Sequence, residues 1–401
     1  MQELMKAVHR RHRGPLSRTD RFSLKEAERA RAFHQTFPVY EPTPLAVLPS
    51  LSEALGIASF HVKDESKRFG LNAFKVLGGS YCIGSYIADR LGMNISDLTY
   101  EKITGSEVKK KLGALTFVTA TDGNHGRGIA WTARALGQRA VIYMPEGSSP
   151  ERLRNIRALG AEAEITDLNY DDTVRYASGQ AEKNGWILTQ DTAVAGDMKI
   201  PTWIMQGYLT MALEAVEQLH GEKPTHIFLQ AGVGAMPGAL TGFFRSLWGD
   251  GEDRPVITIV EPDQADCFYR TAKADDGKLH SVTGPMHSIM AGLCCGEPCT
   301  IGWEMLSDHA DFFVSMPDWV AAKGMRVLGN PLRGDDRVIS GESGASTTGL
   351  VAALCQDPDL ADLREEIGLD RSARVLCFST EGDTDQENYR KIVWDGLYPS
   401  F

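Results

Sequence analysis

The sequence predicts a two-lobed α/β protein in which each lobe is a mostly parallel sheet covered by helices. Short apolar runs alternate with amphipathic runs along most of the 401 residues, which is the pattern of strands that alternate with helices. The alternation forms two series, separated near residue 190, and strands buried on both faces by helices form parallel sheets. The 42% of hydrophobic and 24% of charged residues fit a globular chain long enough for two cores.

The first series of apolar runs lies before residue 191. It predicts strands over 115–120, 139–145, 161–167 and 186–191. Between them lie a helix over 127–136 that ends at Gly137, a helix opened by Ser149-Pro150, and a helix that ends near residue 184. Proline suits a first helical turn because its missing N–H would have no partner there.

The second series predicts a larger lobe. Helices are expected over 203–219, over 237–248 and after Ser343, and strands over 226–231, 255–261, 312–317 and 374–380. We therefore assign residues 1–90 and 191–401 to a large domain and residues 91–190 to a small domain.

Charge and cysteine usage exclude several classes of protein. The net charge of −11 argues against a nucleic-acid partner, because phosphate neutralisation needs basic patches. No apolar run approaches the roughly 20 residues that span a bilayer, and the N-terminus lacks the apolar region of a signal peptide. The seven scattered cysteines favour a reducing cytoplasm and no metal site. The sequence does not decide whether Cys267 pairs with Cys294 or Cys295.

Ligands of open α/β sheets bind at the carboxyl ends of the strands, so the residues at such junctions and helix starts carry the functional information. In the segment 72–80, Phe74 and Lys75 precede Gly78 and Gly79 at the predicted start of a helix. An amine beside an aromatic face, with backbone free to approach a ligand, is what a Schiff-base lysine for pyridoxal 5′-phosphate needs. A surface lysine at a helix start is the alternative for this segment taken alone.

Two glycine-rich turns follow predicted strands and open helices. The turn 121–126, Thr-Asp-Gly-Asn-His-Gly, can bind an anion such as an amino-acid carboxylate, although an ordinary strand–helix turn has the same composition. The loop 232–238 can hold a phosphate through its backbone N–H groups. Its glycines run G-x-G-x-x-x-G, which is neither a Walker loop nor the Rossmann fingerprint, and Glu261 lies 29 residues beyond Gly232. A nucleotide site is the second choice.

A hydroxyl group follows the last predicted strand, in the segment Ser379-Thr380-Glu381-Gly382-Asp383-Thr384-Asp385. Such a hydroxyl can hydrogen-bond a pyridine nitrogen. The alternative is a turn that caps the helix after Asp385.

The order of these four segments resembles the fold-type II pyridoxal-phosphate enzymes, the group of serine and threonine dehydratases, threonine synthase and tryptophan synthase β. The resemblance covers nearly the whole chain. Within the group, NAFKVLGGS, TDGNHGRG and STEGDTD together resemble the diaminopropionate ammonia-lyases. The resemblance implies a homodimeric lyase that converts 2,3-diaminopropionate to pyruvate and two ammonia molecules. A serine or threonine dehydratase-like lyase is the alternative, followed by a Rossmann-type nucleotide-binding protein.

The resemblance also implies roles for individual residues. Lys75 would hold the cofactor covalently, Phe74 would pack beside its ring, and Asn124 would hydrogen-bond its 3′ oxygen. Thr380 would face the pyridine nitrogen, with Ser379 as the second choice. The phosphate would be held by Gly232, Val233, Gly234, Ala235 and Met236, and the substrate would be bound by Thr121, Asp122, Gly123 and His125.

The chain departs from the dehydratases at Asp122, where those enzymes carry a serine or threonine. A carboxylate beside the substrate carboxylate needs compensation, and a second substrate ammonium supplies about 4 kcal/mol at about 4 Å and an effective dielectric of 20. Asp122 is alternatively a base on the cofactor face opposite Lys75, so that Lys75 serves L and Asp122 serves D substrates. Asp191, at the end of the strand 186–191, is a further candidate catalytic carboxylate, and a helix-capping or hinge role is the alternative. In the glycine-rich loop 281–299 we expect His287 and Glu297 to be ordinary loop residues.

Overall fold

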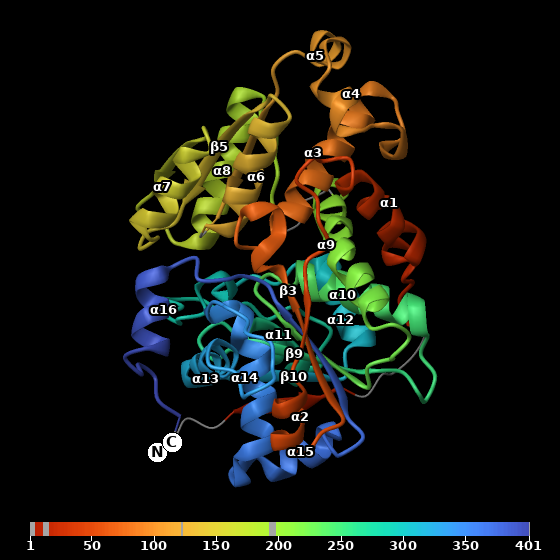
Figure 1. Ribbon diagram of the computed structural model, residues 1–401. Coiled ribbons are helices and arrows are strands. Elements are labelled where there is room, and N and C mark those ends of the chain that lie inside the picture. Colours follow the sequence, from red (N-terminus) through yellow and green to blue (C-terminus); the bar gives the residue numbers. More distant parts are fainter. Residues whose placement is uncertain (1–4, 11–15, 122, 192–197, 401) are drawn as a thin grey trace.

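The computed structural model describes residues 5–10, 16–121, 123–191 and 198–400, and these form two sheets with helices around each (Figure 1). The larger sheet has the order β1-β10-β9-β8-β11-β3-β2. Its five central strands run parallel, and the edge strands β1 and β2 are antiparallel to their neighbours. The bounds are β1 Lys6–His9, β2 Leu45–Val47, β3 Ser59–Asp64, β8 His226–Gln230, β9 Val256–Pro262, β10 Phe312–Met316 and β11 Arg374–Ser379.

The smaller sheet has the order β6-β5-β4-β7, and all of its pairs are parallel. Its strands are β4 Thr116–Ala120, β5 Arg139–Met144, β6 Glu162–Ile165 and β7 Ile187–Leu188. Around it lie α6 (Asn124–Ala135), α7 (Pro150–Ala158) and α8 (Tyr170–Asn184), with α4 (Tyr100–Thr104) and α5 (Ser106–Leu112) at its far end (Figure 1). The predicted division of the chain at residues 90 and 191 stays a prediction.

Helices cover both faces of the larger sheet, as parallel strands require. In β8 and β9, Ile227, Leu229 and Ile257 pack into one core, whereas Phe228 and Val260 pack into the other. The first core contains side chains of α9 (Lys199–Gln218), α10 (Ala235–Trp248), α11 (Cys267–Ala274) and α12 (Thr300–His309). The second contains those of α2 (Pro49–Leu55), α13 (Asp318–Gly329), α14 (Glu342–Gln356), α15 (Ala361–Ile367) and α16 (Gln386–Val393).

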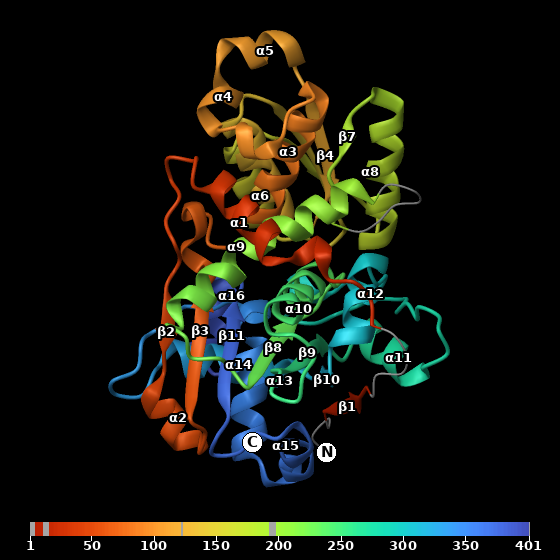
Figure 2. The same cartoon turned by 90° about the vertical axis from the view of Figure 1, so that its right-hand side faces the viewer.

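The two sheets are joined through helices that pack between them. Helix α3 (Val76–Leu91) packs against α6 of the smaller sheet and against α9, and α9 also contacts α1 (Leu24–His34) and α10. Figure 2 shows α9 and α1 between the upper and lower parts of the molecule. Short 3-10 turns cover Asp20–Phe22, Glu65–Gly70, Ile95–Asp97, Ala291–Leu293 and Pro358–Leu360.

The mixed α/β architecture with mostly parallel sheets confirms the fold expected from the alternation. Three local predictions need correction. Helix α6 begins at Asn124 rather than at Arg127, and β7 spans two residues rather than six. The edge strands β1 and β2 were not predicted, because three or four residues give too short a pattern to detect. Within the described ranges, no helix is long and apolar enough to cross a membrane.

Candidate active site

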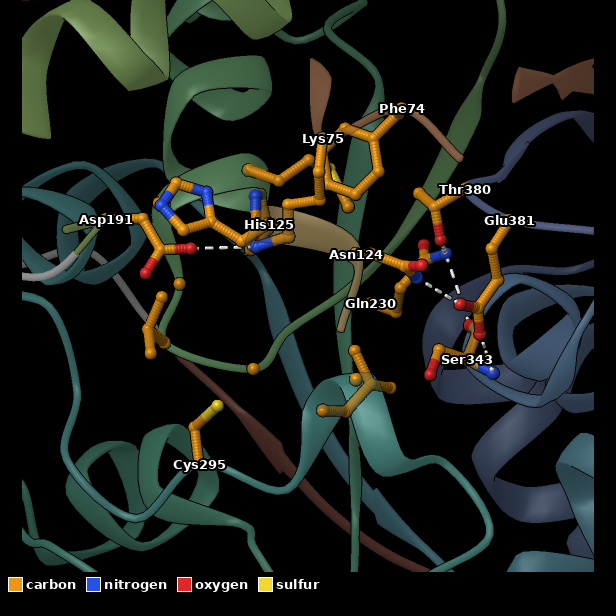
Figure 3. Close-up of a pocket in the computed structure, with 18 of the residues that line it drawn as sticks. Phe74, Lys75, Asn124, His125, Asp191, Gln230, Cys295, Ser343, Thr380 and Glu381 are labelled. Atoms are coloured by element: carbon orange, nitrogen blue, oxygen red, sulfur yellow. Dashed lines mark hydrogen bonds and ion pairs between the residues drawn. The ribbon is translucent and has the colours of Figure 1, made fainter. Parts of the chain in front are cut away.

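A cavity between the two sheets collects most of the residues singled out in the sequence (Figure 3). It has about 660 Å³ of atom-free space, part of it open to solvent. The residues that line it come from the start of α3, the β4–α6 turn, the segment after β7, the β8–α10 loop, the loop before α12, the start of α14 and the end of β11. They are Phe74, Lys75, Thr121, Asn124, His125, Tyr170, Asp191, Gln230, Gly232, Val233, Gly234, Ala235, Met236, Pro237, Gly292, Leu293, Cys295, Ser343, Thr380 and Glu381.

Lys75 immediately precedes α3, and its partly buried amine forms an ion pair with the buried carboxylate of Asp191. The Nζ–Oδ2 distance is 2.8 Å, and the Asp191 side chain is 3% exposed. Burial alone would raise the pKa of Asp191, but the charges of Lys75 and His125 outweigh it and lower the pKa to about 2. Burial likewise opposes the charge on Lys75, yet the Asp191 carboxylate raises the pKa of the amine. The pair therefore favours the protonated amine.

Two aromatic rings lie beside this amine. The Lys75 Nζ is 5.5 Å from the centre of the Phe74 ring and 6.0 Å from that of the Tyr208 ring, and the two rings lie 4.7 Å apart. An ammonium within about 6 Å of an aromatic face gains a cation–π attraction. Tyr208, in the middle of α9, had no distinguishing sequence signal and was not predicted.

The segment that carries Lys75 is held to α9 by a buried ionic network. Arg68 contacts Glu65 at 2.8 Å and Glu214 at 2.7 Å, and Lys63 contacts Glu214 at 2.8 Å. The four side chains are 0–2% exposed. The two positive and two negative charges compensate each other, which is needed because an unpaired buried charge is strongly destabilising. The network fixes the chain that leads from β3 to Lys75.

The turn after β4 is organised by Thr121, whose Oγ1 accepts hydrogen bonds from the N–H groups of Gly123 (2.9 Å) and Gly126 (3.1 Å). The N–H groups of this turn were expected to be able to bind an anion, and these two donate to Thr121 instead. Gly123 is not among the lining residues. The first helical N–H groups, those of Asn124 and His125, precede the first intrahelical bond and lie at the cavity.

His125 has its ring placed by a hydrogen bond between Nε2 and the backbone oxygen of Thr189, at 2.7 Å. Its charge is one of those that lower the pKa of Asp191. Asp122, the predicted opposite-face base, lies outside the described residues.

The β8–α10 loop has the form expected of a phosphate cradle. Gly234 adopts φ +89°, and a Cβ at this position would lie 2.2 Å from Cζ of Phe268. Only glycine meets both conditions. Helix α10 starts at Ala235, so its first N–H groups, which lack intrahelical partners, lie at the cavity. A hydrogen bond from Cys299 N to Val233 O, at 2.8 Å, holds this loop to the segment just before α12.

The hydroxyl of Thr380 lines the cavity opposite the Lys75–Asp191 pair (Figure 3). Gln230, the last residue of β8, donates from Nε2 to the Thr380 Oγ1 at 2.9 Å. The Thr380 hydrogen is then available for a different acceptor. Ser379 is fully buried, donates to Ser340 and does not line the cavity. The backbone N–H of Phe74 donates to the backbone carbonyl oxygen of Thr380 at 3.0 Å, which ties the lysine segment to the residue that carries this hydroxyl.

Glu381 lines the cavity next to Thr380 and was missed as a site residue. Its Oε2 accepts a hydrogen bond from Asn124 Nδ2 at 2.5 Å, and its Oε1 accepts one from Ser343 N at 3.1 Å. A signal existed, since Glu381 is within the STEGDTD segment. Gln230 also had a signal, as a polar residue that ends an apolar strand.

The loop 281–299 contributes to two regions. Gly292, Leu293 and Cys295 line the cavity described above. His287 lines a neighbouring cavity, and Glu297 forms an exposed ion pair with Arg175 at 2.5 Å.

Other candidate residues have structural partners. Cys267 is a free thiol whose Sγ donates to Glu261 at 3.6 Å, so it pairs with neither Cys294 nor Cys295. Glu261 accepts hydrogen bonds from Phe268 N and Tyr269 N at the start of α11, so it serves as a buried helix cap there. Among the described residues, no group of three or more His, Cys, Asp or Glu side chains could hold a metal ion.

The polar groups of the cavity fit a ring with a phosphate at one end. Within the described part of the chain, Gln230 Oε1 and Ser343 Oγ are buried without a hydrogen-bond partner, and both residues line the cavity. Buried polar atoms normally have hydrogen-bond partners, so two such atoms without a partner in one cavity indicate that a polar ligand binds there. An amine, a hydroxyl and a glycine loop at a helix start are the groups that pyridoxal phosphate requires.

Comparison with known proteins gives the same class. The family model described as pyridoxal-phosphate dependent enzyme matches residues 36–378, and the chain belongs to this family. Its cofactor is pyridoxal phosphate. Threonine deaminase from Solanum lycopersicum shares the fold, with a TM-score of 0.70 at 18% identity over 96% of each chain.

Within the family, the chain belongs with the diaminopropionate ammonia-lyases. It is 53% identical to the diaminopropionate ammonia-lyase of Salmonella typhimurium over 91% of both chains. It is 51% identical to that of Escherichia coli, over 94% of this chain and 93% of the relative. The crystal structure of the Escherichia coli enzyme in complex with D-serine superimposes with a TM-score of 0.92, at 48% identity, over 99% of this chain and 98% of that one.

Proposed function

We propose that this chain catalyses the α,β-elimination of 2,3-diaminopropionate to pyruvate and two ammonia molecules, with pyridoxal phosphate as cofactor. One observation carries the proposal. The Lys75–Asp191 ion pair, the glycine loop and the Thr380 hydroxyl line a single cavity in a chain half identical to diaminopropionate ammonia-lyases. A crystal structure of the Escherichia coli enzyme contains an aminoacrylate–cofactor reaction intermediate, which is the species that β-elimination generates.

The cofactor supplies the electron sink that makes the substrate Cα proton removable. Lys75 holds the cofactor through its amine, and residues 232–236 bind the phosphate with their backbone N–H groups. When it is not bonded to the cofactor, the Lys75 amine would accept the Cα proton of the L isomer. The resulting ammonium donates this proton to the departing β-amino nitrogen, which leaves as ammonia.

Asp191 adjusts the proton affinity of Lys75. Its carboxylate, 2.8 Å from the amine, stabilises the ammonium that forms when Lys75 takes the Cα proton. The carboxylate can also attract the charged second amine of the substrate as it binds, and that amine loses its extra proton to water before Lys75 protonates it as the leaving group. This charge distinguishes diaminopropionate from serine and threonine, whose leaving group is a hydroxyl.

Thr380 keeps the electron sink moderate. The Thr380 Oγ1 accepts a hydrogen bond from Gln230, so the Thr380 hydroxyl hydrogen can be donated to another acceptor. An unprotonated pyridine nitrogen is such an acceptor. A hydroxyl cannot hold that nitrogen protonated as an aspartate does. A weaker sink favours elimination of the β group over reactions that need a fully developed carbanion.

The substrate carboxylate is assigned to the start of α6. Asn124 and His125, the first two residues of α6, line the cavity there, and a helix N-terminus favours an anion. We retain Asp122 as the base for the D isomer. Asp122→Asn is expected to lower kcat on D-diaminopropionate at least tenfold more than on the L isomer, whereas equal losses would remove the face-specific role.

The cofactor lysine is tested first by absorbance. Lys75→Ala is expected to lose the visible band of the lysine-bound cofactor, and Lys199→Ala, which alters a surface lysine, is expected to keep it. A yellow Lys75→Ala protein would refute the assignment. Steady-state rates on diaminopropionate, D-serine, L-serine and L-threonine then test the substrate, and a preference for a hydroxyl amino acid would favour the dehydratase alternative.

We also propose that the enzyme is a cytoplasmic homodimer, as expected for the group it resembles. The free thiols of Cys267, Cys355 and Cys377 support a reducing compartment. Sedimentation equilibrium of the purified holoenzyme tests the dimer, and a monomer at micromolar concentration would contradict it.

A further inference from the structure

Asn124 and Glu381 form a hydrogen bond that crosses the cavity between the two sheets (Figure 3). Asn124 is the first residue of α6, which packs on the smaller sheet, and Glu381 follows β11 of the larger sheet. They are 257 positions apart in the sequence. The Nδ2–Oε2 distance of 2.5 Å is at the short end for a bond between an amide and a carboxylate. The cavity therefore has a polar contact that joins both lobes.

The Glu381 carboxylate is itself fixed by its surroundings. The residue is 3% exposed, and Oε1 accepts from Ser343 N in the first turn of α14, where the helix N-terminus favours a negative charge. The backbone of Glu381 forms an isolated antiparallel bridge with Ala73, and Ala73 lies two residues before Lys75 in the sequence. Gly341 N donates to the Glu381 backbone oxygen at 3.0 Å. Glu381 is thus a rigid acceptor rather than a mobile surface acid.

A rigid carboxylate decides which way the Asn124 amide points. An ionised carboxylate only accepts, so the amide must present its NH₂ group to Glu381. One N–H of Nδ2 is used in this bond, and the second remains for another acceptor. Without Glu381 the Asn124 amide can rotate by half a turn and offer its oxygen instead.

We propose that Glu381 is a positioning residue that holds the Asn124 amide so that it donates to the 3′ oxygen of pyridoxal phosphate. The proposal rests on the proposed function, and on the hydrogen bond from Asn124 to the 3′ oxygen that the family resemblance implies. Glu381 contributes a negative charge at the same edge of the cavity. Such a charge stabilises the protonated form of a nearby titrating group.

Glu342 offers a matched comparison. It is 3% exposed, lies one residue before Ser343, and accepts from Asn388 Nδ2 at 3.1 Å, but it borders the neighbouring cavity. Burial and the charge of Glu381 raise the pKa of Glu342 to about 7, while Arg152 lowers it and Asp385 raises it. Glu342 and Glu381 are therefore two buried acids in one region, of which Glu381 contacts Asn124.

The test measures the bound cofactor rather than turnover. In holoenzyme with Glu381→Gln, the visible absorbance should titrate at a pH about one unit lower, because a charge within about 10 Å at an effective dielectric of 20 has an effect of this size. The affinity for pyridoxal phosphate should fall about tenfold. Glu342→Gln should cause clearly smaller changes in both quantities.

A double-mutant cycle separates the two assignments. If Glu381 acts through Asn124, Glu381→Gln should have little further effect on affinity in the Asn124→Ala background. An unchanged titration and affinity in Glu381→Gln, equal shifts in Glu342→Gln, or additive losses in the double variant would overturn the role of Glu381. If Asn124→Ala alone changes neither quantity, both the Asn124 assignment and this inference fail, while the Lys75→Ala spectrum still tests the proposed enzyme.

Discussion

The buried pair of Lys75 and Asp191 makes the sharpest prediction. Asp191→Asn keeps the shape of the side chain and one acceptor but removes the negative charge 2.8 Å from the amine. Coulomb's law at an effective dielectric of 20 gives about 6 kcal/mol for this separation. Breaking a buried pair from one side typically costs 3–5 kcal/mol. The lower value corresponds to a fall of about two units in the pKa of the Lys75 amine.

The assay is the pH dependence of kcat on 2,3-diaminopropionate, with holoenzyme whose cofactor content is checked by absorbance. Lys75 must carry a proton to the leaving amine, so a weaker hold on that proton should move the basic limb about two pH units lower. Separately, losing about 3 kcal/mol of stabilisation of the ammonium that forms during proton transfer should lower kcat about 100-fold. Asp311→Asn is the control, because this buried carboxylate pairs with Arg245 at 2.9 Å outside the cavity. It should lower stability and leave the pH profile unchanged.

A kcat within threefold of wild type, together with an unchanged basic limb, would refute the role given to Asp191. The pair also has a consequence for stability in the cofactor-free protein. The pKa of Asp191 is lowered to about 2 in the folded state, so its stabilisation is present above about pH 4 and is lost as the pH falls toward 2. The difference between wild type and Asp191→Asn in urea unfolding should therefore shrink over that window.

Three further substitutions test other parts of the site. Gly234→Ala places a Cβ 2.2 Å from Phe268 at a residue with φ +89°. We therefore expect the affinity for the cofactor, measured by fluorescence titration, to fall at least tenfold. Wild-type affinity would exclude this loop as the phosphate-binding loop. Thr380→Asp should hold the pyridine nitrogen protonated and lower the ratio of elimination to transamination, measured by product analysis; an unchanged ratio would contradict this. Glu214→Ala leaves Lys63 buried without its carboxylate partner and Arg68 paired with Glu65 alone, and should lower the free energy of unfolding by about 3–5 kcal/mol in urea; a loss below about 1 kcal/mol would show that the network is not needed.

Much of the fold followed from the sequence because it depends on local patterns. The central strands β8 and β11 were expected within one residue, since buried parallel strands are continuous apolar runs bounded by turn residues. The antiparallel edges β1 and β2 were missed, because edge pairing depends on a partner far away in the sequence. The start of α6 was placed three residues late, since Asn124 was taken to be part of the turn.

The sequence alone determined the chemical groups and their order: Lys75 after Phe74, the glycine loop after β8, and Thr380 after β11. These signals are local, because strand ends and glycine turns are recorded in neighbouring residues. Which side chains meet was decided only by the tertiary structure. Asp191 reaches Lys75 across 116 positions and Glu381 reaches Asn124 across 257. Such contacts arise from the packing of two separate sheets around one cavity, and no local pattern encodes the distance between them.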